Sequence, residues 1–358
     1  MKHIFTIHSP ITFLAALGTI VYENIATENV VFICGGNFEP NLAPDFKGQV
    51  VPSYDRMEAS FSFVNKIKHF NYTKSANDYI AKVTENQSFI AYVDLMSVFN
   101  RYLVMHSKCQ QFHVIEEGIV NYADYDDFML WTADLKSFDW QWKSFGAFKQ
   151  MANAGVRMLR GRSLRLLAMP IHPNLYTLHQ GVNAYCFSDA AFKYTPANQK
   201  KVLSWKGLNK LVSIAETTYA NGDWFWIGDT LCKSYGVRME HFENALQQLL
   251  ETINPRKEVR IIHVKFRGSE SETEKKLTLT YLERYNFKVQ MVAKSEMMEM
   301  VFLNHAHLNV CGIASSLLIY ANEMGHQTHS LFPFIPNQYN ISLTKSYFSI
   351  AKKVGFLS

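Results

Sequence analysis

The sequence predicts an α/β fold in which the chain forms two Rossmann-like, doubly wound domains, each built on a parallel sheet. The chain has 358 residues, which is the length of about two domains. Short apolar segments typical of strands alternate with longer segments whose apolar residues recur at helical spacing. Strands that are separated by helices pair in parallel, and such sheets carry helices on both faces.

The alternation of strands and helices is regular in both halves of the chain. A helix begins after Ser9 and Pro10, which suit the first turn of a helix, and another ends at Gly325, which suits its carboxyl end. We expect strands at residues 3–7, 29–36, 88–94, 111–118, 223–231, 258–266, 287–293 and 308–316. We expect helices at residues 11–25, 95–108, 238–253, 296–306 and 317–325, and one more after residue 272.

These elements predict the domain boundaries. The first domain should span residues 1–190 and the second residues 221–333. The intervening residues 191–220 are polar and rich in lysine, and we expect them to form the crossing segment. Residues 334–358 have the pattern of an amphipathic helix, which we expect to pack back on the first domain or to lie on a lipid surface.

Composition and charge exclude several classes of protein. The formal net charge of +5 is too small to indicate nucleic-acid binding, although it suits acidic ligands or an anionic membrane surface. The five cysteines are odd in number and form no Cys-x-x-Cys pair, which predicts free thiols in a reducing compartment. No apolar run approaches the ~20 residues of a membrane-spanning helix. We therefore expect a cytoplasmic protein.

An apolar strand in the first half ends at two adjacent carboxylates, Glu116 and Glu117, followed by Gly118. Ligands of doubly wound sheets bind beyond the carboxyl ends of the strands, which is where these side chains lie. Successive side chains of a strand point to opposite faces, so only one of the two carboxylates needs to face a ligand.

The second half has three candidate ligand groups at strand ends. Ser315 and Ser316 open a helix after a strand, where helix N–H groups bind phosphate well, although an ordinary N-cap explains them too. Lys265 and Arg267 could neutralise a phosphate, or could form a solvated basic loop balanced by acidic neighbours. Either of two carboxylates at a helix start, Glu296 or Glu299, could cap that helix or accept hydrogen bonds from ribose hydroxyls.

Four short segments together resemble bacterial sialyltransferases of the GT-B type. They are Ile115-Glu-Glu-Gly118, residues 225–231, Glu299 and residues 310–317 with their paired serines. The resemblance implies a GT-B fold with two domains that face a central cleft. It implies that Ser315 and Ser316 hold the phosphate of a CMP-sugar and that Glu299 holds its ribose. It further implies that Glu117 is the general base beside Glu116, and that Gly228, Asp229 and Thr230 lie against the nucleotide.

One motif departs from the family pattern. The family usually has a Lys-x-His-Pro signature, whose histidine lies over the donor phosphate, whereas this chain has Lys265-Phe266-Arg267-Gly268. CMP needs little protonation as it leaves, so a guanidinium at Arg267 can stabilise it by charge and hydrogen bonds. Alternatively, His263 reaches the phosphate.

The resemblance implies an inverting, metal-independent glycosyltransferase without a cofactor. It would move sialic acid, or the related legionaminic or pseudaminic acid, from its CMP donor to a hydroxyl of a bacterial surface glycan such as lipooligosaccharide or capsule. We expect His8 and Ser9 to contact the acceptor, and the protein to lie in the cytoplasm, with the inner membrane surface as a peripheral partner. The alternatives are a GT-B transferase with another nucleotide sugar, and a non-catalytic scaffold that binds glycan or lipid.

Four other motifs carry weaker expectations. Asp124–Asp127 contains the Asp-x-Asp pattern of metal-dependent glycosyltransferases, but an exposed helix start explains it better. His305 and His307 are expected to be structural, because no further ligand completes a metal site. His172-Pro173 is a His-Pro pair in the first half of the chain, which is not where the order of the family's motifs places it. The arginines between residues 157 and 165 suit a solvated face, or a patch for an acidic glycan or lipid.

Overall fold

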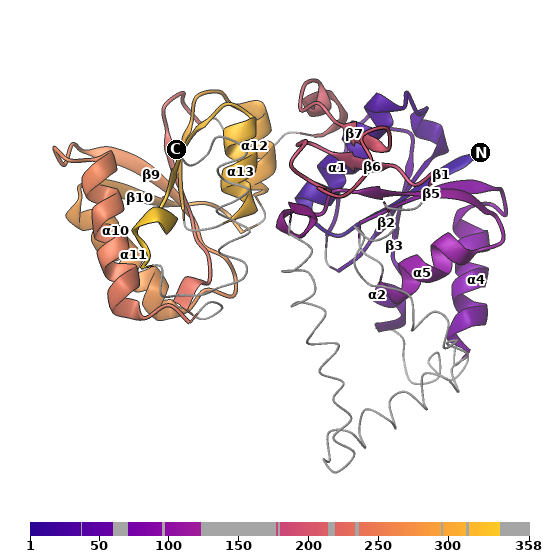
Figure 1. Ribbon diagram of the computed structural model, residues 1–358, viewed down its shortest axis with the longest axis horizontal. Coiled ribbons are helices and arrows are strands. Elements are labelled where there is room, and N and C mark those ends of the chain that lie inside the picture. Colours follow the sequence, from indigo (N-terminus) through magenta and orange to yellow (C-terminus); the bar gives the residue numbers. More distant parts are fainter. Residues whose placement is uncertain are drawn as a thin grey trace, which may run out of the picture. The chain divides into compact units, whose positions relative to one another are not determined.

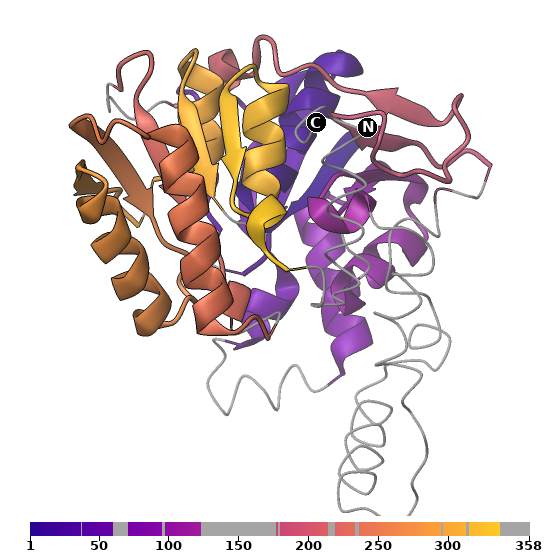
Figure 2. The same cartoon turned by 60° about the vertical axis from the view of Figure 1, so that its left-hand side comes forward.

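The computed structural model describes residues 1–36, 38–59, 71–94, 97–122, 177, 180–213, 219–232, 236–294, 296–312 and 315–336. The chain divides into two compact units, Met1–Ser213 and Ile214–Ser358. Each unit is a parallel sheet covered by helices (Figures 1 and 2). The predicted fold class of two doubly wound α/β domains is therefore confirmed.

The first unit contains a sheet of seven strands in the order β3-β2-β1-β4-β5-β6-β7, and all its neighbouring strands run parallel. The order reverses between β1 and β4, which makes the carboxyl ends of these two strands the topological switch point. The strands are β1 (Lys2–Ile7), β2 (Val30–Cys34), β3 (Gln49–Pro52), β4 (Phe89–Val93), β5 (Cys109–Ile115), β6 (Ala184–Cys186) and β7 (Lys200–Val202).

Helices cover both faces of this sheet (Figure 1). The helix α1 (Pro10–Tyr22) packs on β1, β5 and β6, and α5 (Val98–Met105) packs on β4 and β5 beside α4 (Tyr72–Val83). A short helix, α2 (Tyr54–Ala59), follows β3. All residues of β2 are buried, which fits a central parallel strand with both faces covered.

The second unit contains a sheet of five parallel strands in the order β10-β9-β8-β11-β12. Its switch point lies between β8 and β11. The helices α10 and α11 cover one face of the sheet, and α12 and α13 cover the other (Figure 1). The elements are β8 (Trp224–Ile227), α10 (Met239–Ile253), β9 (Arg260–Lys265), α11 (Glu272–Arg284), β10 (Phe287–Met291), α12 (Met298–Asn304), β11 (Asn309–Gly312), α13 (Ser316–Glu323) and β12 (Gln327–Ser330).

The core of the second unit lies between its sheet and the first pair of helices. Trp226 of β8 and Val264 of β9 are fully buried there against Leu246 and Leu250 of α10. Burying a large apolar side chain contributes roughly 1.5–3 kcal/mol, so this layer supports the strand ends that carry the predicted donor site.

The end of the first domain differs from the predicted boundary. The segment expected to cross between domains, residues 191–220, contains β7, which pairs with β6 in the first sheet. The first unit accordingly extends to Ser213. The predicted helix at residues 334–358 lies almost entirely outside the described residues. None of the described helices is long and apolar enough to span a membrane.

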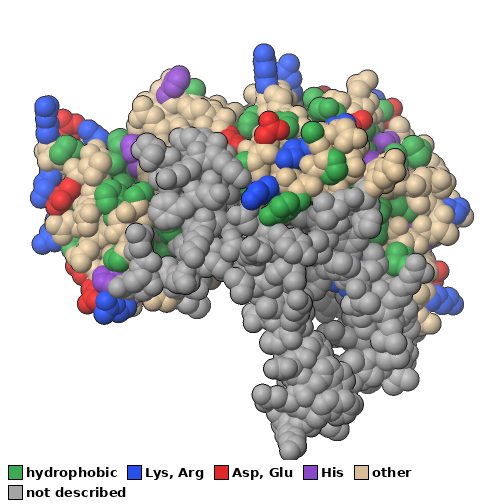
Figure 3. All heavy atoms as spheres, in the orientation of Figure 1, with side chains coloured by type: hydrophobic (Ala, Val, Ile, Leu, Met, Phe, Trp, Pro, Cys, Tyr) green, Lys and Arg blue, Asp and Glu red, His purple; other side chains and the backbone are tan. Residues whose placement is uncertain are grey.

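The described surface is mixed in charge. In the view of Figure 3, lysine and arginine side chains are interspersed with aspartate and glutamate side chains over the residues that the structure describes. This pattern matches the small net charge of the sequence.

Candidate active site

The carboxyl ends of three neighbouring strands bring His8, Asp94 and Glu117 together in the first unit. His8 follows β1, Asp94 follows β4, and Glu117 lies just beyond β5. Nδ1 of His8 contacts the carboxylate of Asp94, and Nε2 of His8 lies 3.5 Å from Oε1 of Glu117. Sequence reasoning singled out His8 and Glu117 but missed Asp94. The available signal was a carboxylate at the end of a buried strand, the same pattern that marked Glu117.

The two carboxylates hold a positive charge on the imidazole of His8. Burial of the ring disfavours that charge, but the hydrogen bonds and charges of Asp94 and Glu117 outweigh it and raise the pKa of His8 to about 10. His8 is therefore an imidazolium at neutral pH.

The adjacent carboxylates Glu116 and Glu117 have different surroundings. Glu116 is fully buried and accepts hydrogen bonds from the Tyr122 hydroxyl at 2.6 Å and the Phe187 backbone N–H at 2.7 Å. The side chain of Glu117 is 16% exposed, and its Oε2 has no hydrogen-bond partner among the described residues. Glu116 thus ties β5 to the loop after β6, while the carboxylate of Glu117 is partly exposed and its buried Oε2 has no partner among the described residues.

The turn after β5 holds Glu116 and Glu117 in these different surroundings. The side chain of Asn121 accepts hydrogen bonds from the backbone N–H groups of Glu117 at 2.6 Å and Gly118 at 3.2 Å. Gly118 has a φ of 135°, a conformation that favours glycine. The glycine of the Glu-Glu-Gly motif is therefore required by the backbone.

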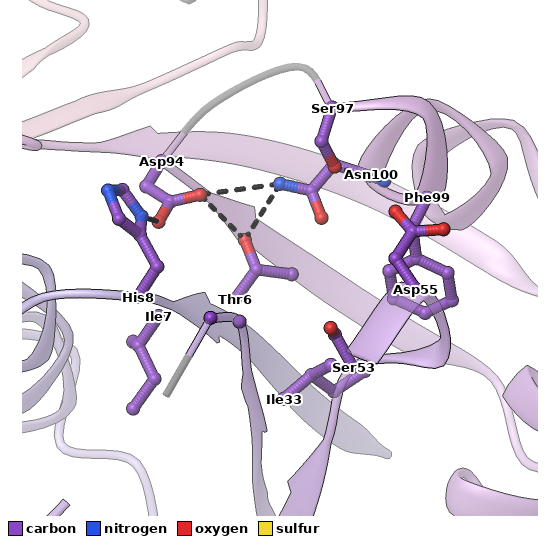
Figure 4. A pocket seen from close by; sticks show the side chains of 12 residues that line it. Thr6, Ile7, His8, Ile33, Ser53, Asp55, Asp94, Ser97, Phe99 and Asn100 are labelled. Carbon is purple, nitrogen blue, oxygen red and sulfur yellow. Dashed lines mark hydrogen bonds and ion pairs between the residues drawn. The ribbon is translucent and has the colours of Figure 1, made fainter. Parts of the chain in front are cut away.

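A pocket of about 200 Å³ lies beside His8 and Asp94 at the switch point (Figure 4). Its lining includes Ser53, Asp55 and the ring of Phe99. Polar groups around one aromatic ring suit a ligand rich in hydroxyls. Ser9 caps α1 through a capping box with Thr12, and its predicted contact with the acceptor stays a prediction.

The switch point of the second unit holds the predicted donor loops. Gly228, Asp229 and Thr230 follow β8, while Ser315 caps α13 and accepts a hydrogen bond from the Leu317 N–H at 3.2 Å. Ser316 is the first residue of α13. The motif therefore lies at a helix N-terminus, as the sequence predicts, and its role in phosphate binding stays a prediction.

Lys265 and Arg267, the two cations of the segment that departs from the family pattern, have different contacts. The ammonium of Lys265 donates to the backbone oxygens of Ala293 at 2.6 Å, Lys294 at 2.9 Å and Glu296 at 2.9 Å. These bonds occupy its three protons, so Lys265 supports the loop before α12. Arg267 is 61% exposed and donates one N–H to the buried carboxylate of Asp229 at 2.9 Å.

The imidazole of His263 lies away from the carboxyl ends of the strands. Its Nε2 is 3.5 Å from Oδ2 of Asp223. Asp223 directly precedes β8 and so lies at the amino end of that strand. The rings of Tyr219 and Phe225 lie 4.8 Å and 5.0 Å from it. Of the two candidates for the phosphate, this geometry favours Arg267.

The two carboxylates near α12 also differ in their contacts. Glu296 accepts a hydrogen bond from the Tyr219 hydroxyl at 2.9 Å. Glu299 lies in the first turn of α12, and burial raises its pKa to about 7, against the charge of Lys265. The Tyr219 hydroxyl therefore binds the carboxylate of Glu296, and Glu299 is the carboxylate that does not carry this hydrogen bond.

A further carboxyl group, that of Glu270, lies against Gly228 in the predicted donor loop that follows β8. Glu270 is 4% exposed, and a Cβ atom added to Gly228 would lie 2.2 Å from its Oε2. Burial, together with the charges of Glu274 and Asp229, raises the pKa of Glu270 to about 8, against the opposing effects of the Arg267 backbone and Lys275. In the sequence, Glu270 is one of the acidic neighbours that could balance Lys265 and Arg267.

Replacing Glu270 by glutamine should stabilise the protein at alkaline pH. The folded state binds a proton at Glu270 up to about pH 8, whereas the unfolded state releases it near 4.5. Stability is therefore lost as pH rises through that window, by at most about 1.4 kcal/mol per pH unit. Urea unfolding between pH 5 and 9 should show a flatter profile for Glu270→Gln. The exposed Glu272→Gln is the matched control, and equal slopes for Glu270→Gln and the wild type would contradict the expectation.

The weaker motifs lie outside the described residues or outside these two sites. Asp124–Asp127, the arginines between 157 and 165, and His172-Pro173 lie outside the described residues. His305 accepts a hydrogen bond from the Tyr219 backbone N–H at 3.2 Å. Within the described ranges, no three His, Cys, Asp or Glu side chains come together as metal ligands.

Comparison with known proteins identifies the fold. No family model matches the chain, and no curated relative matches its sequence.

The sialyltransferase from Photobacterium damsela is similar in structure, with 13% identity and a TM-score of 0.50, over 100% of this chain and 80% of that one. The 2,6-sialyltransferase of Photobacterium sp. JT-ISH-224, solved with CMP and lactose, has 10% identity and a TM-score of 0.48, over 100% of this chain and 76% of that one. E. coli heptosyltransferase WaaC has 12% identity and a TM-score of 0.38, over 99% of each chain. The chain therefore has the two-domain GT-B fold of glycosyltransferases.

Proposed function

We propose that this protein is an inverting glycosyltransferase that transfers a nonulosonic acid such as sialic acid from its CMP-activated form to a glycan hydroxyl. The observation that carries the proposal is the carboxylate of Glu117 at the switch-point edge of the first sheet. One of its oxygens faces an imidazolium, and its side chain is 16% exposed. Such a group can accept the proton of an attacking hydroxyl.

In the proposed reaction, the acceptor hydroxyl attacks the anomeric carbon of the donor sugar. Glu117 takes the hydroxyl proton as the new C–O bond forms, and the bond from the anomeric carbon to the phosphate oxygen breaks. The electron pair of that bond leaves with CMP. A single displacement of this kind inverts the anomeric configuration.

The donor would be held by the second unit. The N-terminus of α13 with Ser315 and Ser316 suits the phosphate, because unpaired N–H groups and the helix dipole favour an anion. Arg267 adds a guanidinium at the carboxyl end of β9. Glu299 suits the ribose hydroxyls, as the family resemblance implies.

Nucleotide binding tests the donor class. A ligand that binds only the folded state raises its melting temperature. We expect CMP to raise the melting temperature more than UDP, GDP or ADP at equal concentration. A larger shift with another nucleotide would replace CMP in the proposal, and no shift with any nucleotide would favour a non-catalytic scaffold.

Removing the guanidinium of Arg267 should slow transfer without preventing folding. We expect Arg267→Ala to lower kcat by ~10²-fold, because an electrostatic partner of the leaving phosphate is lost. Steady-state kinetics with the CMP donor provide the measurement, and His263→Ala is the matched comparison, since His263 contacts Asp223 instead. A severe loss in His263→Ala with normal turnover in Arg267→Ala would reverse the assignment.

A further inference from the structure

We propose that His8 and Asp94 form a positioning pair, in which Asp94 orients His8 and His8 holds the carboxylate of Glu117 for proton abstraction. This inference rests on the proposed function. It replaces the expectation that His8 binds the acceptor with a role that acts through Glu117.

The carboxylate of Asp94 is buried, and groups of the protein bind both of its oxygens. Its side chain is 4% exposed. One carboxylate oxygen contacts His8, and the other accepts hydrogen bonds from the Thr6 hydroxyl at 3.2 Å and the Asn100 amide at 3.3 Å (Figure 4). Because both oxygens are engaged in this way, we assign the effect of Asp94 on Glu117 to its contact with His8.

The position of His8 is fixed from two sides. Its backbone N–H donates to Oγ1 of Thr12 at 3.0 Å, which anchors the residue to the first turn of α1. Its Nδ1 contacts Asp94, and this contact directs Nε2 toward Glu117 at 3.5 Å. A carboxylate that orients an imidazole in this way sets both the angle of the ring and the location of its protons.

The charge of His8 then determines what it can do. An imidazolium has both nitrogens protonated, so it donates to Glu117 and cannot accept the proton that Glu117 removes. The Nε2 proton draws Oε1 of Glu117 to one side. Oε2 of Glu117 is buried and has no hydrogen-bond partner among the described residues, so the acceptor hydroxyl would approach the exposed part of the carboxylate, beside His8. The pair thus fixes the orientation of the base.

Kinetics of substituted proteins distinguish positioning from acceptor binding. We expect His8→Gln and Asp94→Asn each to lower kcat by ~10-fold to 10²-fold, with the acceptor KM unchanged within about threefold. Because Asp94 acts through His8, the double variant should be no slower than His8→Gln alone. His3→Gln is the matched control, because His3 lies near the opposite end of β1 and pairs with Tyr92. Circular dichroism confirms that each variant folds.

A spectroscopic readout tests the pair without turnover. The ring nitrogens of His8, followed by NMR, should remain protonated up to about pH 10 in the wild type. In Asp94→Asn the ring should lose its proton at lower pH, since one of the two carboxylates that favour the charge is gone. His3 provides the internal reference in the same spectra.

The outcomes separate this inference from the proposed function. An increase in the acceptor KM with unchanged kcat would overturn the pair, as would rate losses that multiply in the double variant or an unshifted titration in Asp94→Asn. A wild-type protein that consumes no activated sugar would overturn the proposed function itself, and with it the role assigned to His8.

Discussion

Replacing Glu117 by glutamine should lower the rate of glycosyl transfer by at least ~10²-fold, because the amide cannot accept the proton of the attacking hydroxyl. The substitution preserves the shape of the side chain. An amide can still face His8, whose Nε2 lies 3.5 Å from Oε1 of Glu117. We therefore expect the nucleotide affinity and the melting temperature to change little.

Steady-state kinetics and CMP titration separate the two quantities. A loss in kcat with unchanged CMP binding supports the assignment of Glu117 as the base. The matched control is Glu28→Gln, in which an exposed glutamate of the same unit is changed. A loss well under ~10²-fold for Glu117→Gln would exclude Glu117 as the general base.

Replacing Glu116 by alanine should instead destabilise the first unit, by about 3 kcal/mol or more. Two buried donors, the Tyr122 hydroxyl and the Phe187 N–H, would lose their acceptor. A buried polar group without a partner costs about 1–3 kcal/mol. Thermal unfolding should show the loss, and hydrogen exchange should locate it in peptides from β5 and β6.

Two comparisons make this result specific. Glu28→Ala removes an exposed glutamate of the same unit and should leave stability unchanged. Tyr122→Phe removes only one of the two donors and should cost less than Glu116→Ala. A stable Glu116→Ala protein with severely reduced turnover would show that Glu116 takes part in the chemistry instead.

The sequence revealed most of the inner strands of the first sheet, because they are apolar runs buried in the sheet. β2 is an unbroken apolar run, and its residues are all buried in the structure. β3 and β7 were missed because they lie at the two edges of the first sheet, and the inner strand β6 was missed because it has only three residues. β7 reads Lys-Lys-Val and is not fully covered, so its sequence lacks the apolar pattern of a central strand.

The candidate site was predictable only in part, because strand order is not visible in the sequence. Glu117 and His8 were both singled out, yet their proximity follows from β4 lying between β1 and β5. Asp94 belongs to that intervening strand end and contacts a residue 86 positions away. The role of Lys265 in holding a loop was hidden as well, because its partners are backbone oxygens, which any sequence provides.

The most direct test of the account is to follow a CMP-activated nonulosonic acid by proton NMR in the presence of the protein and a set of oligosaccharide acceptors. The account predicts that CMP is released only with active Glu117, and that the new glycosidic bond has the anomeric configuration opposite to that of the donor. Consumption of a UDP-, GDP- or ADP-sugar with no turnover of any CMP-sugar would contradict it, as would a product that retains the donor configuration.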